Sequence, residues 1–158
     1  GTLTSGFLFK LVPNGKLTTV FFHDGTNGTL AASGLIEDKN GRFFGLTIRA
    51  AKGGKILRMD RDGKFSALVE ISGDCPPCEL IRATDGNFYG ANPFGGSHRM
   101  GAVFQLKSDG MVTNIFEFNG RNGSHPNAQL VQDQGGNLYG TTQGGSGAGG
   151  TVFRLTLK

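Results

Sequence analysis

The sharpest local feature of the 158-residue sequence is a Cys-Pro-Pro-Cys group, which holds the chain's two cysteines, Cys75 and Cys78. A small structural disulfide would stiffen the loop around them, as is common in exported proteins. A redox centre would need the first cysteine at a helix N-terminus in an α/β pattern, and nothing nearby predicts a helix. Zinc needs four ligands, so a zinc site would have to be shared between chains or completed by His98 or His125. We expect the structural disulfide, no metal and no other cofactor.

Two loops rich in Asp, Asn and Gly could hold calcium, whose ligands are oxygen atoms. They are Asp24–Gly28, which contains Asn27, and Asn119–Gly123, which contains Arg121 and Asn122. Neither loop has the EF-hand spacing or a closing glutamate. The same residues form turns by themselves, because their side chains bond to the backbone and tolerate positive φ. We favour turns over calcium sites.

Three histidine-centred groups remain as candidates for catalysis, at His23-Asp24, His98-Arg99 and His125. A serine nucleophile on a Gly-x-Ser-x-Gly elbow is absent from the sequence. Paired carboxylates for glycoside cleavage should face one cleft, whereas the four glutamates fall at strand ends, mostly in non-equivalent places. We therefore predict that the protein is not an enzyme.

These candidate residues belong to a chain built from repeats. The stretch that starts at Leu80 recurs at Leu130, and a more divergent copy starts at Leu35. Each copy holds short alternating apolar runs bounded by turn residues, which predicts short strands. Matched positions are separated by 48, 47 and 49 residues; they are Phe9, Leu57, Phe104 and Phe153. Four strands in a repeat of about 50 residues are typical of a propeller blade.

We number the predicted strands of one repeat from first to fourth in chain order. First strands are expected at Leu35–Asp38, Leu80–Ala83 and Leu130–Asp133, and second strands at Phe43–Thr47, Phe88–Ala91 and Leu138–Thr142. Third strands are expected at Phe7–Val12, Lys55–Asp60, Val103–Lys107 and Thr151–Leu157, and fourth strands at Leu17–Phe22, Phe65–Ile71 and Val112–Phe118. We predict one all-β domain of the β-propeller type, with repeat units at about 6–52, 53–100 and 101–149 and a partial fourth unit at 150–158.

The connections between these strands are of two kinds. First-to-second and third-to-fourth connections contain Asn-Gly, Asp-Gly or Gly-Gly, which favour type I′ hairpin turns. The other connections are predicted to be long and irregular. Since alternate connections of an up-and-down sheet fall at opposite ends, the tight turns should share one face and the long loops the other. A ligand or partner would bind the long-loop face; its candidate residues are Asp24, Asn27, Asn92, His98, Arg99, Asn119, Arg121, Asn122 and His125.

One aromatic position recurs in all three copies, as Phe44, Tyr89 and Tyr139. Such rings could stack on sugars or pack between blades. Because a glycine follows each ring and leaves room for it, we favour packing.

The later copies resemble a known repeat. The residues concerned are Gly-Ala-Val-Phe-Gln-Leu from Gly101, Asn-Ile-Phe-Glu-Phe-Asn-Gly from Asn114, the His125-Pro126 pair, and Gly-Asn-Leu-Tyr-Gly-Thr-Thr-Gln-Gly-Gly from Gly136. They are similar to the GloVer tandem repeat of bacterial surface and secreted proteins. The first copy departs from the pattern at Phe43–Thr47. The resemblance implies a propeller-like fold and an extracellular or cell-surface location, and it brings no catalytic residues.

The number of strands raises a question of closure. The sequence holds three copies of the first, second and fourth strands and four of the third. Propellers usually have four to eight blades, and three blades alone would expose strand edges and apolar faces. Two chains could form a six-blade ring, the chain could be part of a longer array, or chains could join head to tail into a fibre. The spare third strand could exchange between neighbours or pair locally.

The composition limits the kinds of partner. The net charge is +4, but the Lys and Arg residues are not clustered as nucleic-acid binding requires. No run approaches the roughly 18 apolar residues of a membrane span. We expect an exported structural protein whose main partner is itself, in an oligomer or fibre. The alternative is a recognition module that binds a glycan or a surface protein through the long-loop face.

Overall fold

The computed structural model describes residues 7–22, 30–31, 33–50, 53–72, 79–147 and 149–157. Within these ranges the regular elements are all β-strands in antiparallel pairs, which confirms the predicted all-β fold. Across the same ranges, no helix has the length and hydropathy needed to cross a membrane.

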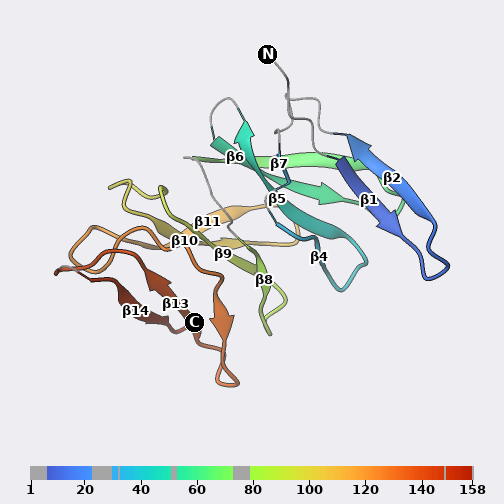
Figure 1. The fold of residues 1–158 in the computed structure, drawn as a ribbon. Coiled ribbons are helices and arrows are strands. Elements are labelled where there is room, and N and C mark those ends of the chain that lie inside the picture. Colours follow the sequence, from blue (N-terminus) through green and yellow to red (C-terminus); the bar gives the residue numbers. More distant parts are fainter. Residues whose placement is uncertain are drawn as a thin grey trace, which may run out of the picture.

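The strands form three blades and a separate hairpin, arranged in a row (Figure 1). Hairpin 1 consists of β1 (Phe7–Leu11) and β2 (Leu17–Phe22). Blade 1 consists of β3 (Leu30–Ala31), β4 (Ile36–Glu37), β5 (Phe43–Ala50), β6 (Gly53–Met59) and β7 (Phe65–Ser72). Blade 2 consists of β8 (Ile81–Arg82), β9 (Phe88–Asn92), β10 (Ala102–Leu106) and β11 (Val112–Glu117). Blade 3 consists of β12 (Val131–Gln132), β13 (Leu138–Thr142) and β14 (Thr151–Leu155). Hairpin 1, in blue, lies at one end of the row and blade 3, in red, at the other.

The three hairpins that join a third strand to a fourth share one register. Leu11 lies opposite Leu17 in hairpin 1, and the equivalent pairs are Met59–Phe65 in blade 1 and Leu106–Val112 in blade 2. Each pairing shifts at the same place, two residues before the equivalent of Leu11. Such a bulge adds one residue and increases the local twist. The repeats therefore agree in strand pairing as well as in sequence.

The tight turns of these hairpins are not the predicted type I′ turns. The Gly15 N–H donates to the Val12 carbonyl at 2.9 Å, and Gly15 has a φ of 81°, whereas Asn14 is not among the residues of positive φ. This is a type I turn followed by a left-handed glycine. A type I′ turn would need positive φ at both central residues, and the ring of Pro13 holds φ near −65°. The turns are tight, as expected, with a different geometry.

The connection between β5 and β6 also differs from the prediction. The two strands continue until Ala50 pairs with Gly53, so the long loop expected here is wrong for blade 1. In blade 2 the chain leaves the sheet at Pro93, which has no N–H for the ladder, and blade 1 has no proline there. The extra strand β3, which was not predicted, pairs with this extension, with Leu30 opposite Ile48.

Two apolar cores lie between the blades. The first joins blades 1 and 2; its buried residues are Phe44, Leu46, Ile56, Ile71, Leu80, Phe88, Phe104 and Leu106. The second joins blades 2 and 3; its buried residues are Ala83, Tyr89, Ala91, Val103, Phe118, Leu130 and Leu138. Tyr89 therefore packs between blades, as we favoured. Blade 2 is covered on both faces, so its central strands β9 and β10 are almost entirely buried.

The glycine of the second strand makes this close packing of blades achievable. A Cβ at Gly90 would lie 2.6 Å from the ring of Phe104 on the neighbouring strand. A Cβ at Gly140 would collide with the equivalent ring of Phe153 in blade 3. The room that we expected for the tyrosine ring is therefore occupied by the phenylalanine of the third strand.

Candidate functional site

The long loops of blades 2 and 3 meet on one face. The His125 N–H donates to the Met100 carbonyl at 2.7 Å, and the His125 carbonyl accepts from Gln143 at 3.2 Å. Ser124 and Gly144 exchange two backbone hydrogen bonds. His125 has a φ of 54°, which is uncommon for a residue other than glycine. This residue links a loop of blade 2 to a loop of blade 3.

The segment Phe94–Met100, which we call the blade 2 loop, is held by hydrogen bonds at both ends. At its start, the side-chain oxygen of Asn92 accepts from the Phe94 N–H at 3.1 Å. At its end, the Gly101 N–H donates to the Gly95 carbonyl at 3.0 Å. These bonds hold the backbone of the loop in a defined shape.

Glu117, on strand β11, anchors the blade 2 loop. One carboxylate oxygen accepts from the Ser97 hydroxyl at 2.6 Å and the Ser97 N–H at 2.9 Å, and the other accepts from the Asn114 amide at 3.0 Å. These bonds, that from the Ser97 hydroxyl first, lower the pKa of Glu117 to about 2. A carboxylate that is ionised and engaged in this way does not suit a general acid, whose pKa should lie near the working pH.

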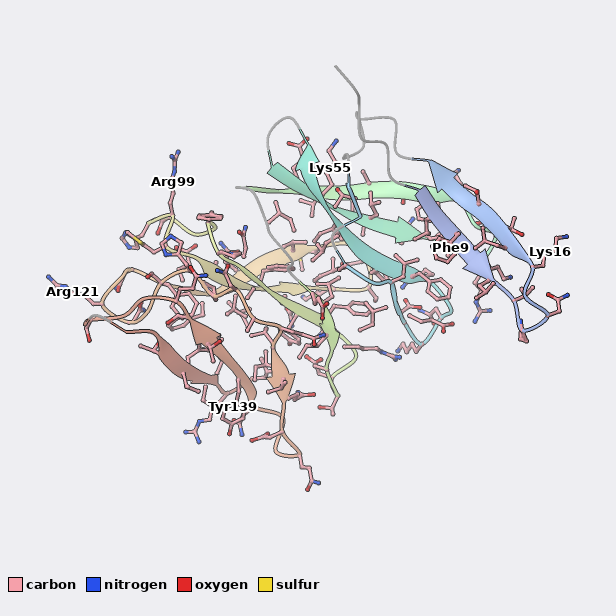
Figure 2. The ribbon with its side chains drawn as sticks, viewed as in Figure 1. Phe9, Lys16, Lys55, Arg99, Arg121 and Tyr139 are labelled. Atoms are coloured by element: carbon pink, nitrogen blue, oxygen red, sulfur yellow. The ribbon has the colours of Figure 1, made fainter. Side chains whose placement is uncertain are left out.

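The blade 2 loop presents a mixed apolar and cationic surface. Phe94 is 41% exposed, and its ring lies edge-on to the ring of His125 with centroids 5.4 Å apart. Met100, His98 and Arg99 are also exposed. Figure 2 shows Arg99 pointing away from the ribbon. An aromatic ring beside a guanidinium can contact the apolar part of a ligand and pair with an anionic group on it.

The loop Asn119–Gly123 forms a turn whose polar side chains are engaged. The Asn119 side-chain oxygen accepts from the N–H groups of Arg121 and Asn122 at 3.0 and 3.2 Å. The Asn122 oxygen accepts from the Asn119 N–H at 2.8 Å. The amide oxygens that would bind calcium point to backbone N–H groups instead, which is the turn arrangement that we favoured. Arg121 is exposed and extends from this turn (Figure 2).

The structure brings some of the predicted site residues together and separates others from them. The structure brings His125 against the loop that contains His98 and Arg99. Asn92 is only 2% exposed, so it shapes the loop and is not open to a ligand. The remaining candidates, Asp24, Asn27, Cys75 and Cys78, lie outside the described residues. In the part of the chain that the structure describes, no group of three or more His, Cys, Asp and Glu side chains could hold a metal ion.

A polar cluster that the sequence did not point to lies on the tight-turn face. The Tyr89 hydroxyl donates to Asp85 at 2.7 Å and accepts from the Gln105 amide at 2.8 Å. Burial, and then the bond to Asp85, raise the pKa of Tyr89 to about 12. The Tyr139 hydroxyl donates a similar bond to Asp133 in blade 3 at 2.9 Å, although Asp133 comes two positions earlier in the repeat than Asp85. An aspartate in the turn before each tyrosine was the available sequence signal, and the cluster is structural because its members satisfy one another.

A cavity of about 460 Å³ lies between blades 2 and 3 beside this cluster. Its lining residues are Tyr89, Gln105, Ile115, Leu155, Thr156 and Leu157. At the equivalent place between blades 1 and 2, Gly110 in the turn of blade 2 lies close to Leu68, the residue equivalent to Ile115. A Cβ at Gly110 would be 3.3 Å from Leu68 Cδ2.

The two ends of the row of blades expose apolar side chains among the described residues. Val103 on β10 is fully buried, whereas the equivalent Val152 on β14 is 78% exposed. Phe104 on β10 is 1% exposed, whereas the equivalent Phe9 on β1 is 53% exposed. Among the described residues, no strand pairs with the outer edge of β14. These ends, together with the blade 2 loop, are the candidate contact surfaces.

The sequence identifies the protein family to which this chain belongs. A family model described as the Gloeobacter/Verrucomicrobia repeat matches residues 1–158. The chain belongs to this family. The motifs that resemble the GloVer repeat are therefore confirmed as motifs of the Gloeobacter/Verrucomicrobia repeat. No curated protein matches the sequence.

Solved structures place this Gloeobacter/Verrucomicrobia repeat protein among propeller-like folds. Selenomethionine-substituted virginiamycin B lyase from Staphylococcus aureus is 13% identical with a TM-score of 0.63, over 96% of this chain and 48% of the lyase. A gluconolactonase from Xanthomonas campestris is 13% identical with a TM-score of 0.52, over 83% of this chain and 45% of the enzyme. At such identities the likeness concerns the fold alone. The repeat chain spans about half the length of these structures.

Proposed function

We propose that this repeat protein is a non-enzymatic building block of an extracellular assembly, in which copies cover each other's open blade ends. The contrast between Val103 and Val152 is the observation that carries the proposal. The two valines occupy the same position of the repeat, and one is buried while the other is 78% exposed. The same side chain is thus buried between blades in the middle of the row and exposed to solvent at its end.

Apolar exposure occurs at both ends of the row. Blade 3 exposes Val131 and Val152, and hairpin 1 exposes Phe9, Leu11 and Leu17. Burying one such side chain contributes about 1.5–3 kcal/mol, and contiguous exposed apolar surface marks interaction sites. Because the two ends differ, a contact between them is head to tail, which gives a closed ring or an open fibre.

The half-length match to the propeller-like lyase supports a ring. The chain aligns with 48% of the lyase, so two copies would supply a number of blades comparable to one complete propeller. Six blades lie within the usual range for closure.

Light scattering on a size-exclusion column tests the proposal through the native mass of this 16.6 kDa chain. We expect a species of twice that mass or an open-ended series. Val152→Asp, which places a charge in the proposed contact, should return the mass to that of one chain. Thr113→Asp, at an exposed position of β11, is the matched control and should leave the assembly intact. A wild-type protein that stays a single chain over a wide concentration range would contradict the proposal.

Export is the part of the proposal that rests on the family resemblance and on the cysteine pair. A Cys75–Cys78 disulfide in protein from the native source should raise the intact mass by about 2 Da on reduction, as expected for an oxidising compartment. Free thiols in freshly isolated protein would argue against export.

The blade 2 loop favours recognition of a glycan or protein as a second candidate function. Its aromatic and cationic side chains are exposed, and Asn92 and Glu117 hold the loop that carries them. A glycan array with wild-type protein and a Phe94→Ala/Arg99→Ala variant tests this function. Binding that the variant loses would support it, and an array without binding would count against glycan recognition.

A further inference from the structure

We infer that the contact between copies is a strand exchange, in which β14 of one copy pairs with β2 of a second copy and displaces β1 of that second copy. The inference rests on the proposed self-assembly and deepens it, because it names the strands and their register. Exchange of an identical element between copies is a low-cost route to assembly.

The shared register of the third-to-fourth hairpins defines how β14 would be completed. In all three described hairpins the third and fourth strands pair with the same offset and the same bulge. β14 is also a third strand, and among the described residues it pairs with β13 on one side only. In this register Leu155 would face Leu17 of the second copy, Arg154 would face Thr18, and Phe153 would face Thr19.

The sequences of β1 and β14 allow one to replace the other. Residues 9–11 are Phe-Lys-Leu and residues 153–155 are Phe-Arg-Leu. Both segments place an aromatic ring, a cation and a leucine at the same three repeat positions. β2 would therefore meet nearly the same side chains on β14 as on its own β1.

The packing of the two phenylalanines decides which strand is displaced. The Phe153 ring lies 5.1 Å from the Phe118 ring and packs over Gly140, so β14 is anchored in the core between blades 2 and 3. Phe9 is half exposed on hairpin 1. Releasing β14 would therefore take Phe153 out of that core, whereas β1 carries its phenylalanine half exposed in a single copy.

The exchange also accounts for the cavity beside Ile115. In blade 2, the turn that contains Gly110 covers Leu68 of blade 1. When β2 of the second copy pairs with β14, its Gly15 takes the place equivalent to Gly110, above Ile115. In one copy alone, a Cβ at Gly15 would meet nothing within 4 Å. In the exchange, this turn would cover the cavity.

Two cysteine variants, both in a Cys75→Ser/Cys78→Ser background, test the exchange. Lys10→Cys/Thr18→Cys joins residues that are opposite each other in β1 and β2, so it locks hairpin 1 in its described pairing without disturbing the fold. We expect the oxidised variant to run at the mass of one chain and the reduced variant to assemble like wild type. Each single cysteine variant is a control and should assemble under both conditions.

The second variant reports the register between copies. Arg154→Cys and Thr18→Cys, carried on separate chains and mixed, should form a covalent dimer on oxidation, because a disulfide needs Cα atoms about 4.4–6.8 Å apart. Val152→Cys mixed with Thr18→Cys is out of register and should not cross-link. If wild type assembles but the locked hairpin also assembles, or the in-register pair does not cross-link, the exchange is overturned and self-assembly stands. If wild type does not assemble, the proposed function fails and the exchange with it.

Discussion

Strands β10 and β14 occupy the same place in the repeat, yet they have opposite surroundings. β10 pairs with β9 and β11 and is covered by blades on both faces, and four of its five residues are buried. In the described part of the chain β14 pairs with β13 alone, and its residues alternate between partly buried and exposed. Their sequences, Ala-Val-Phe-Gln-Leu and Thr-Val-Phe-Arg-Leu, are nearly the same. Burial in a repeat protein therefore depends on the neighbouring repeat as much as on the strand itself.

The largest expected effect comes from placing a charge at the equivalent valines. Val103→Asp would bury an unpaired carboxylate, so we expect a loss of about 5 kcal/mol or a failure to fold. Val152→Asp should change the free energy of unfolding of the single chain by no more than about 0.5 kcal/mol. Urea unfolding of dilute protein measures both. Equal losses of unfolding free energy at the two positions would contradict the difference in burial between β10 and β14.

The second-largest effect is expected from truncating the equivalent phenylalanines. Phe104→Ala removes a ring from the core between blades 1 and 2 and should cost about 3–5 kcal/mol. Phe9→Ala, at a half-exposed ring, should cost about 1 kcal/mol or less. The denaturant midpoints of the two variants, at equal m-value, test the difference. A large loss at Phe9 in dilute protein would show that hairpin 1 is buried in a way that the single chain does not display.

Glycine substitutions compare the packing inside blade 3 with the packing inside blade 2. Gly90→Ala and Gly140→Ala each force a methyl group against the ring of a third-strand phenylalanine, so both should cost about 1–3 kcal/mol. Gly34→Ala is the control, because a Cβ there would meet nothing within 4 Å. Thermal unfolding should rank the control well above the other two. A neutral Gly140→Ala would mean that blade 3 is loosely packed on its inner face as well.

The smallest expected effect concerns pH and the blade 2 loop. The pKa of Glu117 falls from an ordinary 4.5 to about 2 through hydrogen bonds from Ser97 and Asn114. A carboxyl whose pKa is lowered by folding stabilises the native state fully above pH 4.5, and this contribution is lost as the pH falls toward about 2. In folded protein the Ser97 amide resonance should titrate with a midpoint near the lowered pKa, at about pH 2, while Glu117→Gln should abolish the titration and loosen the loop at neutral pH. A Ser97 resonance that titrates near pH 4.5 would show that the hydrogen bonds are weak in solution.

The strand pattern could be predicted because each repeat supplies its own alternation and its own turns. The third and fourth strands of hairpin 1, blade 1 and blade 2 lie close to their predicted positions, and the recurring ring at Tyr89 packs between blades. The prediction failed where a local pattern was ambiguous. Nothing in residues 47–53 indicates that β5 and β6 continue until Ala50 pairs with Gly53. Asn-Gly or Asp-Gly favours type I′ turns until the preceding residues, such as Pro13, are considered.

The site was less predictable than the fold. His98, Arg99 and His125 could be chosen as polar loop residues, but their sequence separation gives no sign that His125 lies against the blade 2 loop. Asn92 seemed equivalent to them in sequence, yet its side chain is buried and forms part of the loop support. Glu117 was assigned no role by the sequence, because its role depends on the approach of Ser97 from another segment.

The sequence by itself determined the all-β repeat of blades, the positions of most strands and the family, since alternation, turn residues and recurring motifs are local properties. Only the tertiary structure decided which copies of the same motif are buried. The apolar face of one blade is covered by its neighbour, so a pattern repeated along the chain becomes a closed core in the middle of the row and an open surface at its ends. Val103 and Val152 carry the same side chain, and their different neighbours make one part of the core and the other part of the proposed contact.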